Sequence, residues 1–405
     1  MKQRRIVWLA AADARGHLTR AHLMRRLLAA HNIDVTLITT GDDGQRYLAE
    51  LGSPSTVLST HYAILFDAWQ NMKTAQTEAQ IAKYFLLPQR AHRDLSTLQQ
   101  LACDAEYIVN DFHPLLLLGG PKVGKVVHVF GASLRHAIAH HFEGRGPELL
   151  DRRFSSWVDS LLRRGFARVE HNVFTPPHGI FRASDKTFVL PPLVSVPDKS
   201  PHDVRRSLNL PKHQKLAAVY LNPHFQDPHL ATALQQVLSE RGYHLYGVSE
   251  RLAHLQGFRP VDAHFANIAF AADVLISAPG MATCSQVRTF GLPFVALTTR
   301  QPEQQVNLAN LQKHHPVQPV DLTDPGVRSN LTLCLHQALE RAEALRTQRS
   351  PSNEFGPDGE VIRNVQHSWA RVFTSLIAGH SPPTYIFNSS THKHPFSNST
   401  HEVLS

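Results

Sequence analysis

Cysteine is scarce in this chain and long hydrophobic runs are missing, and both shortages limit what the protein can be. The 405 residues include three cysteines, which stand far apart in the sequence. Such spacing argues against a disulfide framework or a cysteine zinc site and favours a reducing compartment. No run of about 18 uncharged apolar residues occurs, so we expect no transmembrane helix. The apolar start Ile6–Ala12 is followed at once by Asp13 and Arg15. It is better interpreted as a first core strand than as a signal peptide, and we expect a cytoplasmic protein.

Dense lysine and arginine runs with interleaved aromatic residues are also missing, so we expect no nucleic-acid binding. The net charge is nevertheless +8. This balance favours acidic partners such as nucleotide diphosphates and anionic lipid headgroups. Residues 143–169 have the pattern of a basic amphipathic helix. Such a helix either packs on the core with its basic side in water or lies on an anionic membrane surface, here the inner membrane face.

Hydrophobic patterning predicts two α/β domains. Arg5–Ala11 is an apolar strand, a helical pattern follows it, and Val35–Thr40 is the next strand. This βαβ order predicts a right-handed crossover and a parallel sheet. Tyr62–Leu101 is expected to be mostly helical. Five prolines within residues 191–211 indicate a linker. We expect a first domain at 1–190, a second at 212–360, a final helix at 361–378 and a disordered tail at 379–405.

The most informative stretch is 272–311. Val274–Ile276 reads as a short buried strand, a turn ends at Gly280, and a helix runs on to Gly291. A second strand, Phe294–Leu297, leads into a polar loop. In a parallel sheet this arrangement leaves the amino end of a helix at the carboxyl edge of the strands. Unpaired N–H groups and the helix dipole make that edge a site for anions.

Distinctive positions are spread over this stretch: Asp273, Pro279-Gly280, Thr283, Gly291-Leu292-Pro293 and Glu303-Gln304-x-x-Asn307. In these positions the stretch resembles the donor-binding half of GT-B glycosyltransferases. The group includes the UDP-sugar transferases and the lipid-intermediate N-acetylglucosaminyltransferase of peptidoglycan synthesis. The resemblance implies an α/β GT-B fold of two doubly wound parallel sheets facing across a cleft, with a last helix returning to the first domain. It also implies that a nucleotide sugar binds the second domain and that its base meets backbone groups near 261–264. The donor contacts implied are Asn222, His224, Pro279, Gly280, Met281, Thr283, Gln286, Glu303 and Gln304.

A second match lies where the first strand ends. Gly16-His17 followed by Thr19-Arg20 is similar to the corresponding turn of this group. The resemblance implies that His17 is the general base that takes a proton from the acceptor. Histidine suits this task because its unperturbed pKa lies near neutrality.

Other candidates of the first domain follow later strands. Asp111 ends a predicted strand and would lie beside His17 if the two strands are neighbours. It would then fix the tautomer of the histidine; otherwise it caps the helix that follows it. His113 is a second candidate base or an acceptor contact, and Ser133 is a candidate acceptor contact.

The resemblance implies an enzyme that moves a sugar from a nucleotide sugar, foremost a UDP-sugar, to a small-molecule or lipid hydroxyl. It implies inversion at the anomeric carbon, with no cofactor and no metal. His136 and His140 have helical spacing for a metal, but no third ligand accompanies them. Two alternatives stay open: a UDP-sugar 2-epimerase, and a non-catalytic pseudo-transferase or partner subunit. The second alternative rests on Pro279 in place of the usual glycine, on Gln286 in place of glutamate, and on an Asn222 loop poor in glycine.

Overall fold

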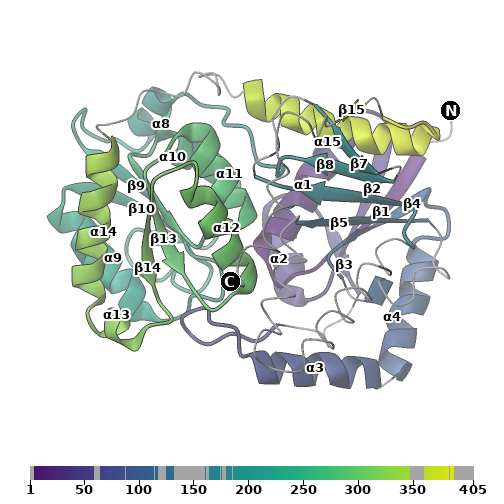
Figure 1. Cartoon of the computed structure of the whole chain (residues 1–405), viewed down its shortest axis with the longest axis horizontal. Coiled ribbons are helices and arrows are strands. Elements are labelled where there is room, and N and C mark those ends of the chain that lie inside the picture. Colours follow the sequence, from purple (N-terminus) through teal and green to yellow (C-terminus); the bar gives the residue numbers. More distant parts are fainter. Residues whose placement is uncertain are drawn as a thin grey trace, which may run out of the picture.

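A computed structural model of the chain describes residues 4–58, 64–86, 88–113, 115–116, 125–131, 160, 164–173, 175, 179–184, 186–346, 360–382 and 384–386. Within them, two sheet-based domains lie side by side (Figure 1). Several predictions fall outside the described residues: those for Ser133, His136 and His140, for most of the basic segment 143–169 and for most of the tail.

The first domain is built on a nine-stranded sheet with the order β15-β7-β8-β6-β5-β4-β1-β2-β3. Paired strands are parallel except β7, which runs antiparallel to β8. The chain proceeds from β1 to β2 on one side and returns to β4 on the other, so the strand order reverses between β1 and β4. The strands are β1 (Arg4–Ala10), β2 (Ile33–Thr39), β3 (Ser55–Val57), β4 (Tyr107–Asp111), β5 (Val126–Gly131), β6 (Ala167–His171), β7 (Phe181–Ser184), β8 (Thr187–Leu190) and β15 (Tyr385–Ile386).

The second domain has a six-stranded sheet with the order β11-β10-β9-β12-β13-β14. All its pairs are parallel, and the order reverses between β9 and β12. The predicted class, α/β with two doubly wound sheets, is therefore confirmed. The strands are β9 (Lys215–Tyr220), β10 (Tyr243–Val248), β11 (Phe258–Arg259), β12 (Val274–Ser277), β13 (Phe294–Thr298) and β14 (Val317–Asp321).

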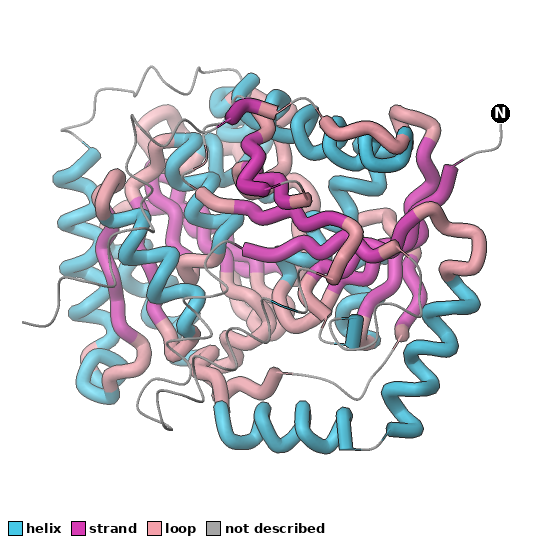
Figure 2. The backbone as a smooth tube through the Cα atoms, turned by 45° about the vertical axis from the view of Figure 1, so that its right-hand side comes forward, coloured by secondary structure: helices cyan, strands magenta, loops and turns pink. Residues whose placement is uncertain are grey.

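Helices cover both faces of each sheet, which explains why the strands are apolar along their whole length. In β1, Ile6 and Trp8 pack toward α1 (Arg15–Ala29) and the last helix, whereas Val7 and Leu9 pack toward the opposite layer. That layer includes α3 (Thr74–Leu86) and α4 (Pro88–Leu101), which run along the outer side of the first domain in Figures 1 and 2. The remaining helices are α2 (Asp42–Glu50), α8 (Pro201–Ser207), α9 (Pro228–Glu240), α10 (Phe265–Ala271), α11 (Met281–Phe290), α12 (Pro302–Gln312), α13 (Pro325–Ser329), α14 (Leu331–Arg346) and α15 (Glu360–Ala378).

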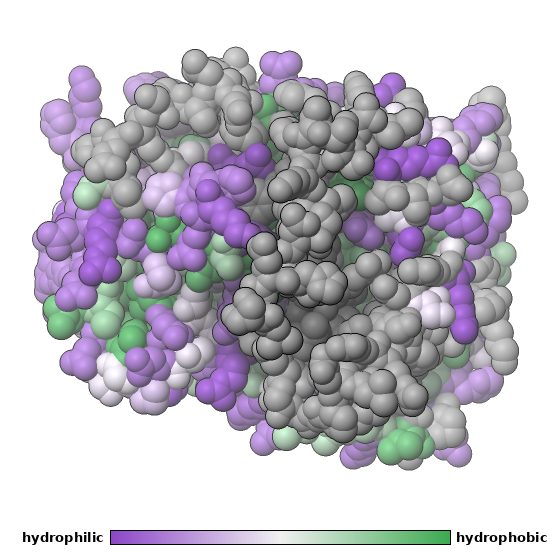
Figure 3. Space-filling model, in the orientation of Figure 1, coloured by the Kyte–Doolittle hydropathy of each residue, from purple (hydrophilic) through white to green (hydrophobic). Residues whose placement is uncertain are grey.

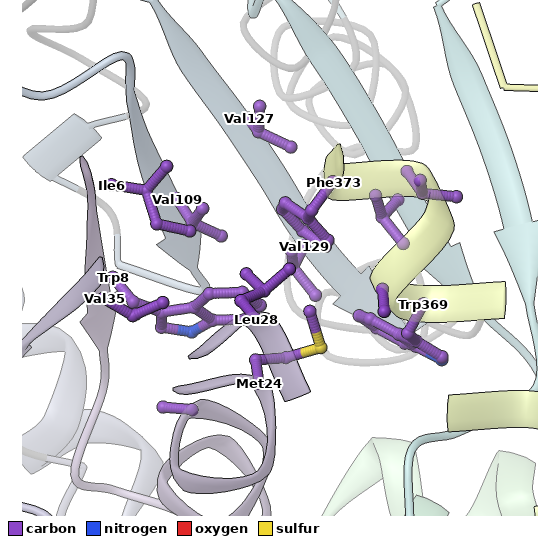
Figure 4. Packing of buried hydrophobic residues seen from close by; sticks show 14 of the residues in the cluster. Ile6, Trp8, Met24, Leu28, Val35, Val109, Val127, Val129, Trp369 and Phe373 are labelled. Atoms are coloured by element: carbon purple, nitrogen blue, oxygen red, sulfur yellow. The ribbon is translucent and has the colours of Figure 1, made fainter. Parts of the chain in front are cut away.

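The last helix, α15, packs on the first domain although it follows the second in sequence. Its Phe373 lies against Trp8 in the core, with 5.2 Å between ring centroids, and Trp369 stacks beside Phe373 (Figure 4). Trp369 Nε1 donates to the carbonyl of Pro191 at 2.9 Å, and the Tyr107 hydroxyl donates to the carbonyl of Leu376. The two domains are thus joined twice, by the linker and by the segment that leads into α15.

Most of 62–101 is helical as expected, in α3 and α4, but residues 64–73 are not. Here the chain forms a looped segment, which we call the strap, before α3 begins at Thr74. The Asp67 carboxylate accepts the backbone N–H groups of Trp69 and Asn71 at 2.9 and 2.8 Å. Aspartate side chains that bond the nearby backbone in this way compete with a helix.

Among the described helices, none combines the length and the hydropathy that a membrane crossing requires. On the face drawn in Figure 3, hydrophilic side chains alternate with small hydrophobic areas over the second domain.

Candidate active site

A cavity of about 240 Å³ lies between the two domains. Its walls include the residues that follow β1 in the first sheet and those that follow β9 and β12 in the second. These are the places where the strand order of each sheet reverses. Loops leave such a point in opposite directions and open a crevice, which is where doubly wound proteins bind ligands. The topology alone therefore explains the position of the cavity.

The amino end of α11 forms the second-domain wall. No side chain caps the helix at Gly280, and its first turn holds no acidic residue. The N–H groups of Met281, Ala282 and Thr283 have no partners within the helix, and the helix dipole adds a partial positive charge there. The cavity is lined by Gly280 and by these three residues. This end of the cavity therefore has the geometry of an anion site.

The backbone conformation at position 280 does not require glycine. Its φ of −69° and ψ of 159° are accessible to any residue. A Cβ atom at this position would meet no atom within 4 Å, so glycine keeps open the space in front of the helix. Gly16, which lines the opposite wall, is equally unobstructed. Both glycines allow a ligand to approach the backbone closely.

α12 supports the same wall from behind. Asn307 Nδ2 donates to the carbonyl of Pro279 at 3.2 Å and so ties this helix to the bend before α11. Pro279 is buried. Gln304 is also buried, and its Oε1 accepts the Thr299 hydroxyl at 2.9 Å. Glu303 is exposed and lines the cavity.

The first-domain wall carries a histidine–aspartate pair. His17 lies in the first turn of α1, and Asp111 ends β4, which pairs with β1. His17 Nδ1 lies 2.7 Å from Asp111 Oδ1. The histidine lines the cavity and is 20% exposed, whereas the aspartate lies behind it and is 0% exposed. In the tautomer that donates Nδ1–H to the carboxylate, Nε2 keeps a lone pair that can accept a proton.

Arg20 holds the same carboxylate from one turn further along α1. Its Nε and Nη2 donate to Asp111 Oδ2 and Oδ1 at 2.8 and 2.6 Å. Trp8 Nε1 also donates to Oδ2, at 3.2 Å. Burial alone would raise the pKa of Asp111, but the charges of Arg20 and His17 outweigh burial and hold the pKa well below its usual range. Asp111 therefore stays ionised as the histidine gains or loses its proton.

Three residues around this pair had no predicted role. Arg20 belongs to the motif that begins at Gly16, but the sequence predicts no function for it. Its Nη1 lies 3.1 Å from His171 Nε2. Burial and the charge of Arg20 hold the pKa of His171 well below its usual value, so His171 is neutral and accepts this bond at Nε2. Phe112 directly follows Asp111, has a positive φ of 64° and stacks on the His17 ring at 5.7 Å between centroids.

The far end of the second-domain wall is lined by Asp262, Ala263 and Phe265. Asp262 accepts the Tyr246 hydroxyl at 2.7 Å and the His264 N–H at 2.8 Å, so its carboxylate already has two partners.

An ion pair links the two walls. Arg15 Nε and Nη2 donate to the two carboxylate oxygens of Glu250 at 2.6 and 2.7 Å. His224 Nε2 lies 2.6 Å from the carbonyl of Asp13, and burial lowers the pKa of His224 to about 4, so the neutral ring donates. Because Arg15 and Arg20 are both paired with carboxylates, the open end of α11 is the main positive feature that the described lining of the cavity leaves to meet an anion.

The structure brings most of the predicted site residues to this cavity. Asp111 reaches it through His17, and within the described part of the chain its carboxylate bonds His17, Arg20 and Trp8 rather than the start of a helix. The prediction for His113 needs correction, because this residue is fully buried and does not line the cavity. Its Nδ1 accepts the Leu115 N–H at 3.2 Å, and burial lowers its pKa to about 4. The predicted residues that line the cavity are Gly16, His17, Asn222, His224, Gly280, Met281, Thr283, Gln286, Glu303 and Gln304.

Within the described ranges, no three histidine, cysteine, aspartate or glutamate side chains gather as metal ligands would.

Comparison with known proteins finds similarity in structure only. No family model and no curated protein matches the sequence. The calicheamicin glycosyltransferase CalG4 superposes with a TM-score of 0.56 at 15% identity, over 95% of this chain and 100% of that one. The glycosyltransferase SsfS6 of Streptomyces sp. SF2575, solved with thymidine diphosphate, has a TM-score of 0.54 at 15% identity, over 92% and 99%.

The chain has the GT-B fold. A Listeria monocytogenes protein described as a UDP-N-acetylglucosamine 2-epimerase shares it, with a TM-score of 0.52 at 12% identity, over 95% of this chain and 99% of that one. At these identities the GT-B likeness establishes the architecture, and any activity must be argued from the site.

Proposed function

We propose that this GT-B protein is a glycosyltransferase that moves a sugar from a nucleoside-diphosphate sugar to a hydroxyl acceptor. One observation carries the proposal: an uncapped helix end and a buried-carboxylate–histidine pair line the same cavity from opposite domains. The uncapped helix end suits binding of a diphosphate. The histidine of the pair suits removal of a proton from a hydroxyl.

In this proposal the diphosphate lies at the amino end of α11, and the N–H groups of Met281 to Thr283 bind its oxygens. Negative charge grows on these oxygens as the anomeric bond breaks. Backbone dipoles fixed at that place stabilise the growing charge without rearranging, so the reaction needs no metal to carry it. The base lies toward 262–265, and the sugar reaches toward Glu303 and Gln304 of α12.

The acceptor hydroxyl lies against His17 Nε2 and attacks the anomeric carbon while the ring takes its proton. Asp111 stabilises the imidazolium that forms, because it remains a carboxylate throughout. One direct displacement predicts inversion at the anomeric carbon. The acceptor is a small molecule or a lipid headgroup, and a UDP- or dTDP-sugar is the donor we expect.

An epimerase would also break the anomeric bond, and it would need a base to remove the proton at C2 of the sugar. The His17–Asp111 pair suits either reaction, and the solved glycosyltransferases of the same fold favour transfer. A non-catalytic role would leave Asp111 its ion pair with Arg20 but would leave His17, at the cavity wall, without a use.

The test is release of nucleoside diphosphate from a panel of UDP- and dTDP-sugars, with and without acceptor alcohols, and the anomeric form of the product. His17→Ala should lower turnover at least about 100-fold, the usual contribution of general-base catalysis, while UDP or dTDP still binds. His31→Ala, an exposed histidine just beyond α1, is the matched control and should keep full activity. Full activity in His17→Ala would refute the assignment. A 2-epimer formed without any acceptor would favour the epimerase.

A further inference from the structure

The strap reaches from the first domain onto the second. Its two arms are bridged by Phe66 and Met72, and Asp67 closes the turn between them. At the tip, the carbonyl of Ala68 accepts the N–H of Gln226 at 2.8 Å, and Asn71 Oδ1 accepts the N–H of Arg300 at 2.8 Å. The strap is thus held in one position by both domains.

Gln70 sits at this tip in an unfavourable state. Its φ is +67°, which is rare for a residue other than glycine. The side chain is 1% exposed and lines the cavity, and Oε1 has no hydrogen-bond partner among the described residues. Backbone strain and an unsatisfied buried acceptor both cost free energy, and they cluster at ligand sites.

Asp13 presents a second acceptor at the other end of the strap. Its Oδ1 accepts the N–H of Ile64 at 3.0 Å, and no described residue donates to its other carboxylate oxygen. Asp13 lines the same cavity as Gln70. Burial raises the pKa of Asp13 to about 6, because the Ile64 N–H and the charges of His17 and Arg15 offset the cost of burial only in part.

The strap tip also touches the helix assigned to sugar binding. Gln301, the residue before α12, donates its side-chain N–H to the carbonyl of Gln70 at 3.1 Å. Glu303 and Gln304, on the first turn of α12, line the cavity beside it. Two residues of the first domain that line this cavity therefore each keep one acceptor oxygen without a donor among the described residues: Gln70 has its Oε1, and Asp13 has its second carboxylate oxygen. In the proposed function this cavity receives the sugar. Unpartnered acceptors require hydrogen-bond donors, and a sugar ring presents several hydroxyl groups.

We propose that Asp13 and Gln70 form a sugar subsite on the first domain, where both accept hydrogen bonds from hydroxyl groups of the transferred sugar. The inference rests on the proposed function and adds that the strap selects the sugar, whereas α11 binds the diphosphate. The donor is then held from both domains, and sugar recognition depends on the strap being seated on α12.

Calorimetric titration can distinguish binding of the sugar from binding of the diphosphate. Wild type, Asp13→Asn and Gln70→Asn are each titrated with UDP, dTDP and the corresponding hexose and N-acetylhexosamine nucleotides. Asparagine keeps the acceptor for Ile64 at position 13, and it tolerates a positive φ at position 70. Gln236→Asn, at an exposed site on α9, is the matched control.

The wild type should bind at least one sugar nucleotide more tightly than the bare diphosphate. Each variant should keep its affinity for UDP or dTDP within about threefold and lose about tenfold in affinity for that sugar nucleotide, the effect of one hydrogen bond to a charged or buried group. Gln236→Asn should match the wild type.

Three results would overturn the inference: variants that keep the preference for the sugar nucleotide, variants that lose both ligands equally, and a wild type that binds the sugar nucleotide no better than the diphosphate. A wild type that binds no diphosphate at all would instead remove the proposed function.

Discussion

Replacing Asp111 by asparagine should destabilise the first domain, because it leaves a guanidinium in the interior without its charge partner. The Asp111 side chain is 0% exposed and that of Arg20 is 7% exposed. The arginine also bonds His171 and cannot turn toward water without breaking that contact. Removing one partner of a buried ion pair costs about 3–5 kcal/mol, most of it from the charge left behind. We expect a loss of this size in the free energy of unfolding.

Arg20→Met removes the other partner of the same ion pair. It leaves a buried carboxylate with His17 and Trp8 as its remaining donors, and we expect a similar loss of about 3–5 kcal/mol. The double variant Asp111→Asn/Arg20→Met leaves neither the carboxylate nor the guanidinium in the interior. Its loss should therefore fall short of the sum of the single losses by at least about 2 kcal/mol, a coupling expected for side chains in direct contact.

Urea unfolding followed by tryptophan fluorescence measures these energies, because Trp8 and Trp369 both lie in the core of the first domain (Figure 4). The exposed pair of Asp43 and Arg46 is the matched control, and Asp43→Asn should change stability by less than about 1 kcal/mol. The Asp111 contribution is present above the pKa of an unfolded aspartate, about 3.9. The gap between wild type and Asp111→Asn should therefore narrow as the pH falls below that value. Losses that add within about 0.5 kcal/mol would refute the coupling.

Three further outcomes follow from the cavity walls. Burial raises the pKa of Asp13 from 3.8 to about 6, so the folded chain binds the extra proton between these values. Relative to Asp13→Asn, the wild type should lose up to about 3 kcal/mol of stability as the pH rises from about 4 to 6; parallel urea-unfolding profiles would contradict this. Glu250→Gln should weaken the link to Arg15 and speed amide exchange at the start of α1, and unchanged exchange would argue against an interdomain tie. Asn307→Ala should free the carbonyl of Pro279, cost about 1 kcal/mol and weaken UDP or dTDP binding measured by calorimetry; unaltered affinity would show that the bend needs no such support.

Much of the fold could be predicted because its signals are local. Apolar strands, such as Val274–Ile276, alternate with amphipathic helices, and this order predicts parallel sheets covered on both faces. The helix after Gly280 ends at Gly291 as predicted, because that residue adopts the left-handed conformation, with φ 64°. The strap was missed because the Asp67 carboxylate bonds the backbone, whereas the composition of the surrounding segment suits a helix.

The candidate site was predictable where it coincides with a motif and not where it depends on pairing between distant strands. His17 and Gly280 follow strands directly, so topology places them at the sheet edges. Arg20, in contrast, gains its role from β4 and β6, which bring Asp111 and His171 beside it. Nothing near Gln70 in the sequence indicates that its side chain enters a cavity between two domains.

The central claim is that the open amino end of α11 binds the diphosphate, and Gly280→Asp tests it most directly. Aspartate is a good helix N-cap, and its Cβ has room at this position, so the variant should be at least as stable as the wild type. Its carboxylate would, however, occupy the N–H groups and repel a phosphate. Calorimetric titration with UDP and dTDP should show 1:1 binding to the wild type and at least about tenfold weaker binding to the variant, a loss of about 1.4 kcal/mol. Equal affinity in the two proteins would contradict the account.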